Sequence, residues 1–167
     1  VELAQDMVLK LGSPDILALQ EVQDDDGTLD SLVTSADATL AALVEVIQQA
    51  GGPQYTWLTI DPKRNADGGV IGGNIRNVIL YRTDRALALA SAPKGDASTA
   101  VEVLVRGGEP QLSLNPGRIS PNSYAFMDSR KPLAVQFRFR GESIFVISNH
   151  LNSKGEDGPI FGDIQPP

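Results

Sequence analysis

The chain has 167 residues, which is the size of one domain with a single hydrophobic core. Hydrophobic residues make up 41% and charged residues 21%, a composition that excludes a disordered or fibrous chain. No apolar run is long enough to span a bilayer, and the absence of cysteine excludes disulfides and thiolate metal sites. The 14 basic and 21 acidic residues give a net charge of −7, so any phosphate ligand requires a local basic site or a bound cation.

Two segments show helical periodicity. Residues 1–11 carry one apolar stripe and are followed by Gly12-Ser13-Pro14, a glycine and proline stop signal. Residues 38–50 repeat apolar side chains at the same spacing and are followed by Gly51-Gly52-Pro53. We therefore expect one helix in each segment.

Strand-like runs occupy much of the remaining chain. The expected strands cover residues 15–19, 55–60, 75–81, 86–90, 101–105, 133–140 and 144–147. Residues 61–73 and 107–128 are rich in glycine or in glycine, proline, asparagine and serine, and we expect loops there. With no internal repeat, this pattern predicts one α/β domain with mixed strand directions.

The first polar cluster is Gln20-Glu21-Val22, at the end of an expected strand. A carboxylate at that place can hold a hard divalent cation, because Mg²⁺ takes one or two carboxylates and keeps several waters. The alternative is a helix-capping or salt-bridging glutamate. The acidic run at 24–26 fails the calcium-loop template, since Val22 and Val33 would occupy the first and last ligand positions. We expect a solvated acidic turn there.

The second cluster is Gly72-Gly73-Asn74-Ile75-Arg76-Asn77. Glycines before a strand can bring backbone N–H groups close to an anion, and Arg76 can form paired hydrogen bonds with phosphate. The cluster is not a nucleotide-hydrolase phosphate loop, because no Gly-Lys-Ser/Thr follows, and it is not a dinucleotide fingerprint, because it opens a strand. When this cluster is considered alone, a structural turn is the favoured interpretation.

The third cluster surrounds His150, the single histidine of the chain, which follows the most apolar strand. Arg130 and Lys131 precede the neighbouring strand of the same expected hairpin. Because residues 133–140 and 143–149 would pair antiparallel, we expect Arg130 and His150 at the same edge of the sheet. An imidazole there can donate to a phosphate oxygen or move a proton near neutral pH. A purely structural histidine is the alternative.

Several stretches resemble a known superfamily in order and spacing over nearly the whole chain. They are PDILALQEVQ (14–23), GGNIR (72–76), VILYR (78–82), SRKPL (129–133), NHLNSKG (149–155) and QPP (165–167). These stretches look like the endonuclease/exonuclease/phosphatase superfamily, the fold of pancreatic deoxyribonuclease. The closer likeness is to its bacterial, mostly secreted, nuclease-like branch.

The resemblance implies an α/β (α+β) fold, a four-layer α/β/β/α sandwich of two mixed sheets, and phosphodiester hydrolysis assisted by Mg²⁺ or Mn²⁺. It also admits Ca²⁺ as a structural or co-activating ion. By the same resemblance Glu21 and His150 are catalytic, Glu21 is the metal ligand, and Arg130 contacts the substrate phosphate. Further substrate contacts implied in this way, with less specific motifs, are Asn74, Arg76, Asn152 and Lys154.

Three features of the family have no counterpart in these 167 residues. They are an Asn-containing first strand, a Gly-Asp-Phe-Asn motif after Gln-Pro-Pro, and a C-terminal Asp-His pair. We therefore expect residues 1–167 to be a single domain truncated at both ends and inactive by itself. The resemblance implies that its parent is a secreted or periplasmic nuclease with a nucleic acid substrate, DNA before RNA. A phosphatase or phospholipase of the sphingomyelinase or inositol-phosphatase type and a non-catalytic binding domain remain alternatives.

Overall fold

The computed structural model describes residues 1–85 and 87–151. A π-helical turn, η1, continues the first helix, and η2 is a 3₁₀ turn. The elements in chain order are α1 (Glu2–Gln5), η1 (Asp6–Lys10), β1 (Ile16–Val22), α2 (Asp37–Gln49), β2 (Tyr55–Leu58), β3 (Arg76–Arg82), β4 (Leu87–Leu89), β5 (Val103–Arg106), β6 (Glu109–Leu112), β7 (Gly117–Arg118), η2 (Tyr124–Phe126), β8 (Leu133–Phe139) and β9 (Glu142–Ser148).

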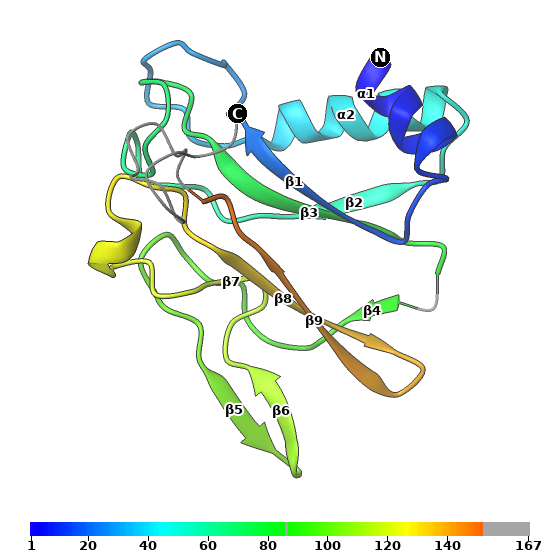
Figure 1. The fold of residues 1–167 in the computed structure, drawn as a ribbon, viewed down its shortest axis with the longest axis vertical. Coiled ribbons are helices and arrows are strands. Elements are labelled where there is room, and N and C mark those ends of the chain that lie inside the picture. The colour runs from blue at the N-terminus through cyan, green and yellow to red at the C-terminus, as the bar shows by residue number, and fades with distance from the viewer. Residues whose placement is uncertain (86, 152–167) are drawn as a thin grey trace, which may run out of the picture.

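The strands form two sheets and a separate hairpin (Figure 1). Strand β3 is the centre of the first sheet and pairs antiparallel with β1 and β2. Strand β8 is the centre of the second sheet, with β9 along one edge and β4 and β7 along the other. The β5–β6 hairpin projects from this second sheet. The named strands of the described ranges all pair antiparallel.

Side chains of β3 alternate between two hydrophobic clusters. Val78 and Leu80 pack with the buried face of α2, which includes Leu40. Ile79 points the other way and packs with Phe137 and its neighbours on β8. The helices, the first sheet and the second sheet therefore form three layers (Figure 1). This arrangement confirms the α/β class, and the fourth layer of the expected sandwich stays a prediction.

Most of the expected elements are present, but residues 107–128 differ from the expectation. Both expected helices and all seven expected strands have a counterpart in the structure. The loop expected at 107–128 was wrong in part, because β6, β7 and η2 lie within it. Strand β6 pairs with β5, and the two residues of β7 pair with β8. Strand β7 depends on a partner elsewhere in the chain, so local composition does not reveal it. The β5–β6 hairpin turns at Gly107-Gly108, a local hairpin signal that the expectation of a loop overlooked.

Apolar and polar side chains alternate along β8, a pattern typical of a half-buried strand, but the polar side chain of Gln136 departs from it. Gln136 is as buried as Val135, although the alternation predicts that it faces solvent. Its Oε1 accepts a hydrogen bond from the backbone N–H of Leu112, and its Nε2 donates to Ser143 Oγ at 3.0 Å. The first bond attaches β6 to the outer face of β8, the second links β8 to β9, and both compensate the burial of the amide. Among the described residues, no helix is long and apolar enough to cross a membrane.

The packing between the two sheets is testable at Phe137, which is fully buried in the inter-sheet cluster. We expect Phe137→Ala to lower the free energy of unfolding by about 3–5 kcal/mol, because it removes apolar contacts and leaves a cavity. Val105→Ala is the control, since Val105 is 75% exposed and should change stability by less than about 0.5 kcal/mol. Urea denaturation followed by Trp57 fluorescence measures both. Equal stabilities for the two variants would contradict this core.

Candidate functional site

Strand β1 delivers Glu21 at an irregularity in its pairing with β3. The register shifts between Leu19 and Val22, and Glu21 has a φ of 57°, in the left-handed region. A bulge of this kind turns a side chain away from the regular alternation of a strand and is frequent beside active sites. The Glu21 side chain is 70% exposed, and its Oε1 lies 3.4 Å from His150 Nε2. The glutamate is therefore part of the strand, and not the residue that follows it.

The β8–β9 hairpin brings Arg130 and His150 together. Leu133 is paired with Ser148, so the residues just before β8 and just after β9 lie at the same edge of the sheet, as expected. Arg130 Nε donates a hydrogen bond to His150 Nδ1 over 3.1 Å. The first sheet is joined to this edge of the second by another hydrogen bond, which the side-chain amide of Gln20 in β1 donates to the Asn149 carbonyl.

One cavity of about 400 Å³ is lined by Glu21, Arg130 and His150 together. The other residues of its lining are Gln23, Gly69, Val70, Ile75 and Leu151. Glu21 comes from the first sheet, whereas Arg130 and His150 come from the second. The cavity therefore lies where the two sheets end together, and it contains a carboxylate, a guanidinium and an imidazole.

The surroundings of His150 lower the pKa of its imidazole below the ordinary value. Burial is the main cause, the positive charge of Arg130 adds to it, and Glu21 opposes both. The neutral ring is therefore the main form at pH 7. Because Nδ1 accepts a hydrogen bond from Arg130, the proton of the neutral ring is on Nε2. His150 thus presents an N–H donor on the side of the ring where Glu21 lies.

Asn74 and Arg76 lie outside the lining of this cavity. Asn74 is 4% exposed and donates through Nδ2 to Asp24 Oδ2 at 2.7 Å. Arg76 is 1% exposed, and its guanidinium donates to Asp61 Oδ1 at 2.5 Å and to the Asn74 carbonyl at 2.9 Å. Both side chains hold loops together, and their contact with substrate stays a prediction. Asn152 and Lys154 lie outside the described residues.

The acidic run at 24–26 is only in part the solvated turn that we expected, because its first carboxylate is buried. Asp24 is 2% exposed, because the Asn74 amide binds its carboxylate and its backbone N–H donates to the Gly73 carbonyl. Asp25 is exposed, and its Oδ1 accepts a hydrogen bond from the backbone N–H of Thr39 in the first turn of α2. The run therefore connects the loop before β3 to the start of α2.

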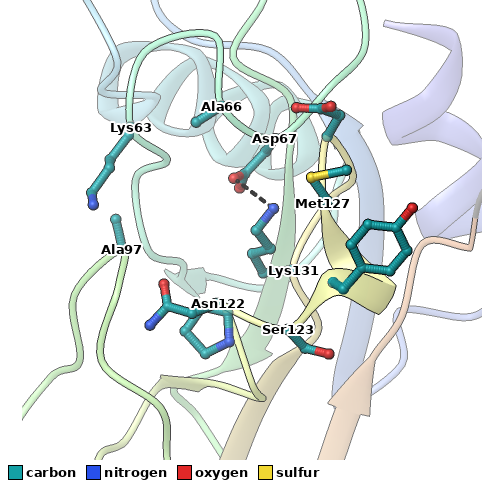
Figure 2. Close-up of a pocket in the computed structure, with 11 residues that line it drawn as sticks. Lys63, Ala66, Asp67, Ala97, Asn122, Ser123, Met127 and Lys131 are labelled. Carbon is teal, nitrogen blue, oxygen red and sulfur yellow. Dashed lines mark ion pairs between the residues drawn. The ribbon is translucent and has the colours of Figure 1, made fainter.

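A second cavity, also of about 400 Å³, contains an ion pair that sequence reasoning missed (Figure 2). Asp67 is 4% exposed, and its carboxylate lies 3.4 Å from Lys131 Nζ and 2.9 Å from a nitrogen of the Arg118 guanidinium. The Asp67-Gly68-Gly69 sequence predicted a loop and gave no sign of these partners. Lys131 was noted only as a cation beside Arg130.

The metal-ligating side chains near the first cavity determine which kind of divalent metal site these residues can form. Among the described residues, no group of three or more His, Cys, Asp or Glu side chains is arranged to hold an ion. Within the described part of the chain, Glu21 supplies the one carboxylate in the lining of the first cavity. This set fits Mg²⁺ or Mn²⁺ in the form that phosphoryl-transfer sites use, in which one or two carboxylates share the ion with substrate phosphate and water. It does not fit an ion held by protein ligands alone.

Among known proteins, the similarity that can be detected for this chain is structural and distant. No protein-family model matches the sequence, and no curated protein sequence matches it. Among solved structures, the chain is similar to an endonuclease/exonuclease/phosphatase family protein from Leptotrichia buccalis C-1013-b, with 16% identity and a TM-score of 0.48. The alignment covers 93% of this chain and 48% of that protein, so the chain spans about half of its length. We therefore infer the function of the chain from its own site residues.

The pKa of His150 tests the geometry of the cluster. Arg130→Gln should raise this pKa, because it removes a positive charge beside the ring, and Glu21→Gln should lower it, because it removes a negative charge. NMR titration of the imidazole measures both changes without assignment, since His150 is the single histidine. Arg106→Gln and Glu45→Gln are charge-matched controls on exposed surfaces and should leave the pKa unchanged. Shifts with the opposite signs would refute the arrangement.

Proposed function

We propose that the Glu21–Arg130–His150 cluster binds a phosphodiester and takes part in its divalent-metal-assisted hydrolysis, with DNA as the first candidate substrate and RNA as the second. The observation that supports this proposal is the hydrogen bond from Arg130 Nε to His150 Nδ1. It places a guanidinium and an oriented imidazole N–H donor in one cavity. The two groups together offer charge and directed hydrogen bonds to a phosphate.

Arg130 is suited to hold the phosphate because its guanidinium has five N–H donors in a fixed plane. One of these donors binds His150, and the outer nitrogens offer the fork that matches two phosphate oxygens. Arg130 is half-buried, so its position is defined, and it is one of the residues that line the cavity.

His150 contributes a neutral donor. Its Nε2–H can bind a non-bridging phosphate oxygen and stabilise the negative charge that grows there as water attacks phosphorus. The lowered pKa of the imidazole means that this donor does not depend on a protonated ring. Its function should therefore persist through neutral and alkaline pH, unlike that of an imidazolium.

The charge balance of the cluster explains the need for a cation. Arg130 and Glu21 cancel, and a phosphodiester adds one negative charge that Glu21 repels. Glu21 is the residue that would hold Mg²⁺ or Mn²⁺, which supplies charge neutralisation at a phosphoryl oxygen and a more acidic bound water. Glu21 therefore favours phosphate binding when the cation is present and opposes it when the cation is absent.

A metal at Glu21 should be detectable without any reaction. We expect Mn²⁺ to broaden the imidazole NMR signal of His150 by paramagnetic relaxation, because the Glu21 carboxylate lies 3.4 Å from the ring. Glu21→Gln should remove most of this broadening, whereas Glu45→Gln, on the exposed face of α2, should leave it unchanged. Equal broadening in the wild type and in Glu21→Gln would exclude Glu21 as the ligand.

Substrate class is tested by binding. In Mg²⁺, a thymidine dinucleotide with one phosphodiester should shift the His150 signal, and Arg130→Gln should weaken its affinity by about tenfold or more, because a charge-assisted hydrogen bond is lost. Arg106→Gln is the matched control. Tighter binding of a nucleoside monophosphate or an inositol phosphate would favour a phosphatase, and tighter binding of phosphocholine would favour a phospholipase. Binding of none of these ligands would refute the proposal.

A further inference from the structure

The buried carboxylate of Asp67 lies between two segments of the chain that meet beside the candidate site. It is ion-paired with Arg118 of β7. It is also ion-paired with Lys131, which directly follows Arg130 (Figure 2). The side chains of all three residues are at most 8% exposed. One negative charge is thus shared by two buried cations that belong to the second sheet and to the turn before β8.

Lys131 uses its ammonium group to fold the turn that carries Arg130. Its Nζ donates to the Phe126 carbonyl at 2.6 Å and to the Ser129 carbonyl at 2.7 Å. Asp67 is the third oxygen partner, at 3.4 Å. Because all these partners are protein oxygens, Lys131 holds residues 126–131 in shape and is not available to a ligand.

Gly68 contacts the same turn through its backbone. Its φ of 69° is in the left-handed region, and a Cβ atom placed on it would overlap the Asp128 carbonyl oxygen. That atom would also lie 3.4 Å from a guanidinium nitrogen of Arg130. The position therefore requires glycine, both for its conformation and for the close approach of the turn.

We propose that Asp67 is a positioning residue for Arg130 and His150. With Gly68, it sets the place of the 126–131 turn. Through the bond from Arg130 Nε, that turn fixes the orientation and the tautomer of the imidazole. This role rests on the proposed function, in which Arg130 and His150 hold the phosphate, but the geometry itself can be tested without a ligand.

Removal of the Asp67 charge should move the 126–131 turn, because two buried cations would remain without their shared carboxylate. Asp67→Asn keeps the size of the side chain but leaves Lys131 and Arg118 buried with no carboxylate between them. Two buried like charges repel, and Lys131 gains by turning its ammonium group toward water. Lys131 would then release the Phe126 and Ser129 carbonyls, and Arg130 would lose its fixed approach to His150.

The imidazole nitrogen spectrum of His150 at one pH above its titration reports this geometry directly. The wild type should show the Nε2–H tautomer, with Nδ1 as acceptor. Asp67→Asn and Gly68→Ala should each give a mixture of tautomers and weaken dinucleotide binding in Mg²⁺ by about tenfold, as Arg130→Gln does. Gly68→Ala changes no charge, so it decides the question if Asp67→Asn does not fold.

Gln136→Leu is the control for a general loss of stability. It removes buried hydrogen bonds on the outer face of β8, and it should leave the His150 spectrum and dinucleotide affinity as in the wild type. Folded Asp67→Asn and Gly68→Ala proteins with a wild-type spectrum would overturn the positioning role. A changed spectrum in both variants, with no dinucleotide binding even by the wild type, would support the positioning role and refute the proposed function.

Discussion

Strand β3 sends alternate side chains into two hydrophobic clusters, and this double burial fixes how the two sheets lie against each other. The candidate site depends on that packing because neither sheet contains it alone. Glu21 belongs to β1 of the first sheet, and Arg130 and His150 belong to the β8–β9 hairpin of the second. The distance of 3.4 Å between the carboxylate and the imidazole is therefore a consequence of side chains such as Ile79, which touch no ligand.

Polar residues around the site divide into an exposed group and a buried group. Glu21 is exposed and faces the cavity, whereas Asp67 and Arg118 are buried behind the turn that carries Arg130. Burial lowers the pKa of the Arg118 guanidinium, and the charge and hydrogen bond of Asp67 oppose that effect. A buried charge is tolerated only with its partner, so these residues define one arrangement of the turn. The exposed Glu21 carboxylate, in contrast, can exchange solvent for a ligand.

Local features of the sequence predicted much of the fold. Helical periodicity, glycine and proline stops and the alternation of β8 each depend on neighbours in the chain. The meeting of Arg130 and His150 was predictable for the same reason, since a hairpin register is set over few residues. The bulge at Glu21 was not predictable, because it arises from pairing with β3.

The roles of residues that contact partners far away in the chain could not be predicted from the sequence. The buried roles of Asp67, Asn74 and Arg76 depend on contacts made only after the loops fold. A polar residue in a glycine-rich loop is expected at the surface, and its burial shows only when the partner that compensates its charge is known. The motif at 72–76 therefore suggested phosphate contacts, whereas its side chains bind Asp24 and Asp61.

The opposite charges of Glu21 and Arg130 give the cluster a reciprocal dependence on its two proposed ligands. With a neutral imidazole, the cluster has no net charge, so neither a phosphodiester nor a divalent cation is strongly attracted on its own. A cation at Glu21 converts a repelling carboxylate into a positive centre beside Arg130, and phosphate oxygens supply the ligands that a single carboxylate lacks. By linkage, each ligand must raise the affinity for the other by the same factor. A site with one carboxylate among its described residues therefore holds a metal weakly by itself and more tightly once its substrate is bound.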